Sequence, residues 1–186
     1  KIGDIVFYKA SFDKEKIKKT KKKTKKLKVL IAAHEVHDAP TPIGQNFFSD
    51  FYKWMVYIMD LSKKTPFEWY IKNHPKQKKM KLYRNQKITE TVTNNLLKKY
   101  KHIKKIPSDT PHNKIIMNGM DVVLTVRGTI ALEYAYFNKP VLIATTNNFT
   151  NPYSFNKYVS NLNSYKKEIL NLDKLKIKIN QKEILE

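Results

Sequence analysis

The residues with the most specific chemistry are Arg127, Gly128 and Thr129, which separate two apolar segments of the chain. An arginine can bind a phosphate through two parallel hydrogen bonds, and the backbone N–H groups of Gly128 and Thr129 can donate to the same anion. Thr129 is also the expected N-cap of the following helix. Glu133 comes one turn later, where its carboxylate could accept from ribose hydroxyls. The pattern predicts a phosphate cradle, against the alternatives of a surface ion pair for Arg127 and a solvent-facing Glu133.

A second candidate is the dipeptide His74-Pro75, which follows a strand expected over residues 67–72. An imidazole held at the end of a strand can donate an N–H to a phosphate oxygen or to the edge of a base. Lys76 comes directly after the proline and would extend this positive region. The alternative interpretation is a turn with an exposed histidine.

The segment H-E-V-H-D contributes His34, Glu35, His37 and Asp38 directly after the first expected strand. Its histidines are three residues apart on an expected loop, whereas the H-E-x-x-H zinc motif places them four apart on a helix. No metal site is therefore predicted, and the segment is interpreted as a polar loop that lines a cleft.

Another polar loop follows the expected strand over residues 102–106. Ser108 and Thr110 in this loop could offer hydroxyl groups to a ligand, although turn formation explains both residues equally well.

These residues must be positioned by an alternation of strands and helices. Apolar β-branched runs predict strands over residues 28–33, 67–72, 102–106, 122–126 and 141–144, and periodic segments predict helices over 47–61, 88–100, 113–119 and 129–137. Such alternation is typical of an α/β protein with a Rossmann-like, doubly wound parallel sheet. Ligands bind outside the carboxyl ends of the strands in these sheets. The loops that follow the strands are therefore expected to share one rim, namely 34–38, 73–76, 107–111, 127–129 and 145–155.

Composition and charge limit the classes of function. The chain has 186 residues, 41% of them hydrophobic, and a formal net charge of +21. All but two of its 37 basic residues are lysine, the exceptions being Arg84 and Arg127. Nucleic-acid readers usually depend on arginine for bidentate contacts, so a nucleic-acid partner is not expected. The lysine excess is typical of a biased genome, but it also creates a positive field that favours anionic partners.

The chain is expected to divide into three parts. Residues 1–27 are predicted to be a basic linker, 28–160 a nucleotide-sugar-binding domain, and 161–186 a C-terminal helix and tail. The run Lys14–Lys28 is either a solvated segment or a strip that contacts an anionic membrane surface. The chain has no cysteine, which fits a cytoplasmic location, with peripheral contact to the inner face of the membrane as an extension of that expectation.

The order of these motifs resembles a known family. The strand ending in N-H-P, the stretch D-V-V-L-T-V-R-G-T-x-x-x-E, and the following N-K-P-V-L-I are similar to bacterial capsule polysaccharide glycosyltransferases, including the β-Kdo transferases that use CMP-Kdo. The upstream H-E-V-H-D-A-P and its aromatic helix strengthen the resemblance, which covers about residues 28–156. These enzymes are of the GT-B type, with two Rossmann-like halves that face a cleft.

The resemblance implies that this chain is the C-terminal, donor-binding half. His74 and Pro75 would contact the nucleotide phosphate, Arg127 to Thr129 would hold phosphate or a donor carboxylate, and Glu133 would hold ribose. No cofactor or metal is implied, and the acceptor would be a glycan or glycolipid. The family takes its catalytic base from the other half, so Glu35 and Asp38 are the only rim carboxylates to test as substitutes.

Other functions stay open at this point. The same fold could use a UDP-sugar, or CDP-glycerol as in teichoic-acid polymerases. A basic nucleic-acid-binding module and a non-catalytic interaction domain of a capsule assembly complex are the alternatives from other classes.

Overall fold

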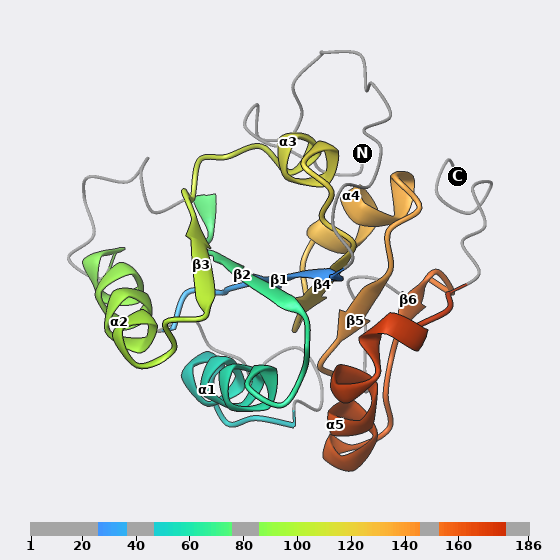
Figure 1. The fold of residues 1–186 in the computed structure, drawn as a ribbon, viewed down its shortest axis with the longest axis horizontal. Coiled ribbons are helices and arrows are strands. Elements are labelled where there is room, and N and C mark those ends of the chain that lie inside the picture. Colours follow the sequence, from blue (N-terminus) through green and yellow to red (C-terminus); the bar gives the residue numbers. More distant parts are fainter. Residues whose placement is uncertain (1–25, 37–46, 76–85, 146–152, 178–186) are drawn as a thin grey trace, which may run out of the picture.

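The computed structural model describes residues 26–36, 47–75, 86–145 and 153–177, and its centre is one parallel sheet. The strand order is β3-β2-β1-β4-β5-β6, and every neighbouring pair is parallel (Figure 1). The strands are β1 (Lys28–Ala32), β2 (Glu68–Lys72), β3 (Ile103–Ile106), β4 (Val122–Thr125), β5 (Val141–Ile143) and β6 (Asn156–Lys157). This order with helices on both faces confirms the predicted α/β, Rossmann-like fold.

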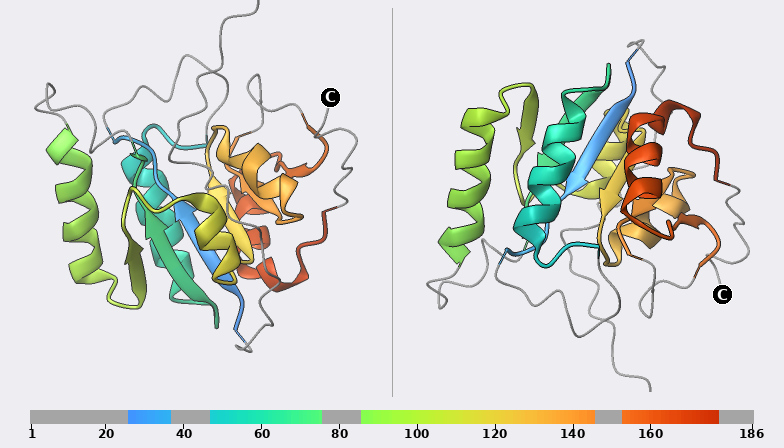
Figure 2. Two further views of the ribbon diagram at one scale, coloured as in Figure 1. Left: turned by 90° about the horizontal axis from the view of Figure 1, so that it is seen from above. Right: turned by 90° about the horizontal axis from the view of Figure 1, so that it is seen from below.

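Helices cover both faces of the sheet. One face carries α1 (Phe51–Ser62), α2 (Gln86–Lys99) and α5 (Leu162–Leu170), and the other carries α3 (His112–Met117) and α4 (Ile130–Tyr136). The two sets lie below and above the sheet in Figure 1, and Figure 2 shows each set from its own side. The chain therefore winds along one face from β1 to β3 and crosses to the other face before β4.

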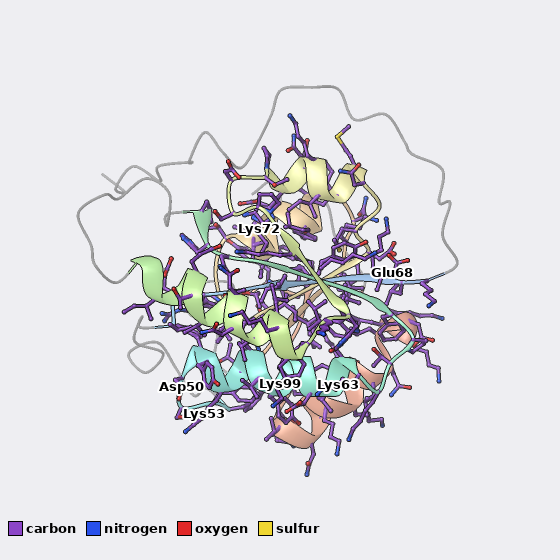
Figure 3. All side chains as sticks on the ribbon, turned by 60° about the vertical axis from the view of Figure 1, so that its left-hand side comes forward. Asp50, Lys53, Lys63, Glu68, Lys72 and Lys99 are labelled. Atoms are coloured by element: carbon purple, nitrogen blue, oxygen red, sulfur yellow. The ribbon has the colours of Figure 1, made fainter. Side chains whose placement is uncertain are left out.

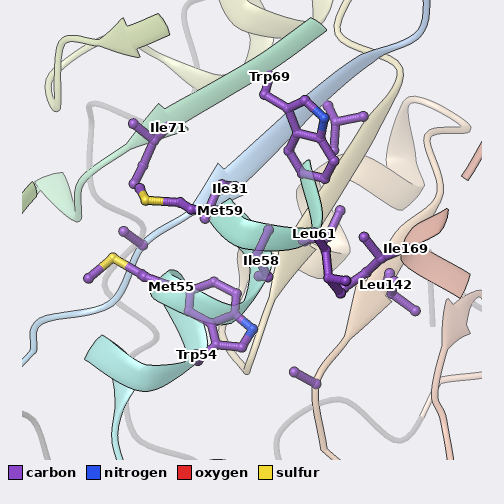
Figure 4. Packing of buried hydrophobic residues seen from close by; sticks show 14 of the residues in the cluster. Ile31, Trp54, Met55, Ile58, Met59, Leu61, Trp69, Ile71, Leu142 and Ile169 are labelled. Atoms are coloured by element: carbon purple, nitrogen blue, oxygen red, sulfur yellow. The ribbon is translucent and has the colours of Figure 1, made fainter. Parts of the chain in front are cut away.

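Each face has its own core, because successive side chains of a strand point to opposite faces. Val29 and Ile31 of β1 pack against α1 and α5, whereas Leu30 belongs to the core under α3 and α4. The α1 side is the larger core and contains buried Trp54 and Trp69 among its aliphatic residues (Figure 4). Strands buried on both faces explain the nearly continuous apolar runs of the sequence.

Most expected elements are present, and the ends differ where a cap decides them. Helix α1 was expected from residue 47 and begins at Phe51, because the extended residue Asp50 accepts a hydrogen bond from the Lys53 N–H at 2.7 Å. The expected cap at Thr129 is wrong: Thr129 has helical φ and ψ, and its side chain makes no capping hydrogen bond. Gly119 follows α3 with φ +86°, a left-handed conformation that favours glycine.

The C-terminal helix shares the core of the strands. Tyr165 and Ile169 of α5 are fully buried in the α1-side cluster, and Trp54 Nε1 donates to the Tyr165 hydroxyl at 3.1 Å. The short turn η3 (Leu172–Lys174) follows, and strand β6 was not expected from the sequence. Lys14 and its neighbours up to residue 25 lie outside the described residues. None of the described helices has the length and apolar character needed to cross a membrane.

Candidate functional site

The candidate site lies at the carboxyl edge of the sheet, where β1 and β4 are neighbours. The chain leaves these two strands toward opposite faces, which makes this pair the topological switch point of the sheet. The loop after β1 contacts the end of β4 and the loop after it, since His34 Nε2 lies 3.0 Å from Oγ1 of Thr125, the last residue of β4, and 3.4 Å from the Arg127 amide nitrogen. The predicted convergence of the 34–38 and 127–129 loops is present for the described residues.

His34 supports the loop that carries Arg127. The amide N–H groups of Val126 and Arg127 both donate to His34 Nε2 at 3.4 Å, and the Thr125 hydroxyl beside this nitrogen donates to the Arg127 carbonyl at 2.8 Å. The imidazole stacks on Phe51 at 4.5 Å, with 18° between the ring planes. Burial, with the nearby charges of Arg127 and His74, lowers the pKa of His34 to about 3. His34 is therefore a neutral support inside the site.

The loop of Arg127 has open space beside Gly128. The Arg127 guanidinium carbon lies 5.4 Å from the centre of the Phe51 ring, a cation–π arrangement that orients the side chain. Gly128 has φ +116°, and a Cβ at this position would meet no atom within 4 Å. Glycine is therefore required here by backbone conformation and not by lack of space. Helix α4 has only seven residues and Thr129 does not cap it, so an anion would depend on Arg127 and the Gly128 backbone more than on the helix end.

His74 is near both His34 and a second polar cluster. It follows β2 at the same edge, and its charge lowers the pKa values of both His34 and His112. Pro75 comes directly after it and is partly buried. The expected neighbour Lys76 lies outside the described residues.

The second cluster contains Lys72, the last residue of β2. Its side chain is on the α3 side of the sheet, away from exposed lysines such as Lys63 and Lys99 (Figure 3), and Lys72 is only 3% exposed. Its Nζ lies 3.4 Å from Nε2 of His112, the first residue of α3. Burial lowers the pKa of Lys72 to about 8, although the negative charges of Glu133 and Asp109 act in the opposite direction.

Glu133 faces this cluster from α4. Burial raises the pKa of its carboxyl group to about 7, against the opposing effect of the Lys72 charge. The next residue, Tyr134, is fully buried, and its ring meets His112 edge-on at 5.9 Å. Burial and the charges of Lys72 and His74 lower the pKa of His112 to about 3, so this ring is neutral.

Three buried polar atoms of this cluster have no hydrogen-bond partner among the described residues: His112 Nδ1, Glu133 Oε2 and the Tyr134 hydroxyl. Buried polar groups are nearly always satisfied in folded proteins, so these three atoms are an unusual feature of this part of the molecule.

The remaining predicted residues are less central. Glu35 Oε2 accepts from the Thr89 hydroxyl at 2.8 Å, which ties the β1 loop to α2. Ser108 is buried, and Thr110 lies in a turn closed by its N–H to the Pro107 carbonyl at 3.0 Å. His37 and Asp38 lie outside the described residues. Within the described ranges no group of three His, Asp or Glu side chains is arranged to hold a metal ion.

Sequence reasoning missed Lys72 and His112. Alternation along E-W-Y-I-K could have placed Lys72 on the same face as Tyr70, under α3, because Trp69 and Ile71 occupy the other core. His112 had no comparable signal, since its position depends on how α3 packs over β2.

Comparison with known proteins adds no family. No family model matches the chain, and no curated protein matches it. The class that the chain's own structure defines is an α/β protein with a Rossmann-like parallel sheet and a polar site at the carboxyl edge of its switch point.

Proposed function

We propose that this chain is the donor-binding half of a glycosyltransferase that transfers a sugar from a nucleotide-activated donor to a glycan or glycolipid of the cell surface. The observation that carries the proposal is the junction of β1 and β4, where the neutral His34 supports the loop of Arg127. His74 and the partly buried Glu133 lie at the same edge of the sheet. The motif resemblance to capsule transferases favours CMP-Kdo as the donor.

The chemistry follows from the residue types. The Arg127 guanidinium would bind the donor phosphate bidentately, and the Gly128 N–H and an imidazole N–H of His74 would donate to its other oxygens. These positive groups and dipoles would stabilise the negative charge that develops on the leaving nucleotide as the bond to the sugar breaks. The acceptor hydroxyl must lose a proton to a base. Since Glu35 bonds to Thr89, we expect that base to come from the other half of the enzyme.

Calorimetric titration with CMP, UDP, CDP-glycerol and a short DNA oligomer tests the proposal. We expect saturable nucleotide binding, with CMP preferred, and a loss of about 10- to 100-fold in affinity for Arg127→Ala, because one charged hydrogen-bonding group contributes about 1.5–3 kcal/mol. Arg127→Lys should recover only part of the loss, since lysine cannot bind bidentately. Lys139→Ala, near Asp121 at the opposite edge, is the matched control.

The outcomes separate the alternatives. Preference for UDP or CDP-glycerol would support the transferase function but would replace CMP-Kdo as the proposed donor. Absence of nucleotide binding, or binding that Arg127→Ala leaves unchanged, would overturn the proposed site. DNA binding that weakens steeply with salt would instead indicate a nucleic-acid module.

A further inference from the structure

Helix α2 turns two fully buried threonines toward the carboxyl edge of the sheet. Leu96, near the end of this helix, packs in the apolar core, whereas Thr89 and Thr93 lie one turn apart nearer its start and are both 0% exposed. Threonine is a weak helix former, and valine would fill the same space without burying a polar group. Two such residues on one buried face therefore indicate a use for their hydroxyl groups.

Thr89 holds the loop that follows β1. Its hydroxyl accepts from the Val36 N–H at 3.1 Å and donates to Glu35 Oε2 at 2.8 Å. These two partners come directly after His34, whose Nε2 accepts from the Arg127 N–H at 3.4 Å. Thr89 therefore fixes the chain one residue beyond the imidazole that supports the Arg127 loop.

Thr93 holds the loop that follows β2. Its hydroxyl donates to Asn73 Oδ1 at 2.9 Å, and Asn73 Nδ2 donates to Glu90 Oε2 at 3.0 Å. Asn73 is 1% exposed, so its amide group has these partners of α2 in place of water. Glu90 is itself fixed by an ion pair with Lys105 of β3. The residue after Asn73 is His74, so α2 also fixes the chain beside the second imidazole of the site.

One helix thus holds the two loops that carry the histidines of the site. The register of β1 and β2 ends with the pair of Ala32 and Lys72, and beyond this pair the hydroxyl groups of α2 bind both loops. His34 and His74 are close enough for the charge of His74 to lower the pKa of His34. The spacing of the two imidazoles therefore depends on where α2 holds each loop.

We propose that Thr89 and Thr93 are positioning residues, and that their hydroxyl groups hold the β1 and β2 loops in the arrangement in which Arg127 and His74 meet the phosphate of the bound nucleotide. The inference rests on the proposed function, because that phosphate is the ligand. Neither threonine contacts the ligand, and each acts through the loop that it holds.

Titration of valine and serine variants with CMP tests the inference. Thr89→Val and Thr93→Val keep the buried volume but remove the hydroxyl group, so each should weaken CMP binding about 3- to 10-fold, the equivalent of one hydrogen bond. Glu35 and Val36 are only half-buried, so water can replace the hydroxyl and Thr89→Val stays folded. Thr89→Ser and Thr93→Ser keep the hydroxyl group and remove a buried methyl group. They should bind CMP as the wild type does, even where urea unfolding shows lower stability.

The serine variants separate positioning from a purely structural role, in which binding would follow stability in both kinds of variant. Tyr100→Phe is the matched control, because it removes a hydrogen bond of 2.8 Å to Asp60 at the amino edge and should leave CMP affinity unchanged. If the valine variants bind CMP like the wild type, or if the serine variants lose as much affinity as the valine variants, the inference is overturned while the proposed function stands. If no nucleotide binds the wild-type protein, both are overturned.

Discussion

The two edges of the sheet differ in whether their buried polar side chains have hydrogen-bond partners. At the amino edge, polar groups pair with one another: Asp121 accepts from the Lys28 N–H at 3.1 Å, and Tyr100 donates to Asp60 at 2.8 Å. His102, just before β3, lies 2.7 Å from the Ser62 hydroxyl. At the carboxyl edge, buried polar atoms of His112 and Glu133 meet no partner among the described residues.

This difference separates structural polar groups from groups placed for a ligand. A paired polar group contributes modestly to stability, whereas a buried group without a partner costs about 1–3 kcal/mol. Such a cost is retained in functional sites, where the ligand supplies the missing partner. The amino edge has one exception, since Asn156 Oδ1 at the start of β6 is also buried without a partner in the described chain.

The largest expected effect compares the histidines at the two edges. His34→Ala removes the acceptor for two amide N–H groups and the ring stacked on Phe51, so it should cost about 2–4 kcal/mol of unfolding free energy and should weaken nucleotide binding. His102→Ala should cost about 1 kcal/mol and leave nucleotide binding unchanged. Urea unfolding and titration of both variants measure this. Equal losses in the two variants would remove the distinction between the edges.

A smaller effect concerns the pH dependence of stability. The pKa of Glu133 is about 7 in the folded protein, against 4.5 for an ordinary glutamate. The folded state favours the protonated carboxyl group, so Glu133 contributes to the free energy of unfolding at low pH. This stabilising contribution is fully present below about pH 4.5 and is lost as the pH rises through about 7. Glu133→Gln cannot ionise and should be more stable than wild type by about 1–3 kcal/mol at pH 8, with little difference near pH 4. Urea unfolding at pH 4 and pH 8 measures this difference in the free energy of unfolding. If the wild type and Glu133→Gln changed in stability with pH by the same amount, Glu133 would be solvated in the folded protein.

The smallest expected effect compares two buried tyrosines. Tyr134→Phe removes a hydroxyl that has no partner among the described residues, so the free energy of unfolding should rise by about 1 kcal/mol, the lower end of the cost of a buried unpaired group. Tyr100→Phe removes the hydrogen bond to Asp60 and should cost about 1 kcal/mol. Thermal or urea unfolding of both variants gives the comparison. A loss of stability for Tyr134→Phe would mean that its hydroxyl is bonded within the protein.

The sequence predicted the fold well because its signals are local. The apolar run before Arg127 and the periodic segment around Trp54 each specify an element without reference to the rest of the chain. The loops at the carboxyl edge then follow from the parallel topology, which is how His34 and Arg127 could be expected on one rim. The short strand β6 was missed because two residues, Asn156 and Lys157, carry no recognisable strand pattern.

The contacts inside the site could not be predicted in the same way. The support of Arg127 by His34 depends on how the loops after β1 and β4 cross, and the contact between Lys72 and His112 depends on the packing of α3 over β2. The resemblance assigned a ribose role to Glu133, but only the packed structure reveals its burial and its proximity to the Lys72 charge.

The most direct test of the account is a titration of the isotopically labelled protein with CMP, followed through its backbone amide resonances. The account predicts saturable shifts at Gly128, His34 and His112 at the carboxyl edge, with Gly119 and His102 at the amino edge unchanged. Shifts confined to the amino edge, or no shift at Gly128 under saturating nucleotide, would contradict the claim that the carboxyl edge is the ligand site.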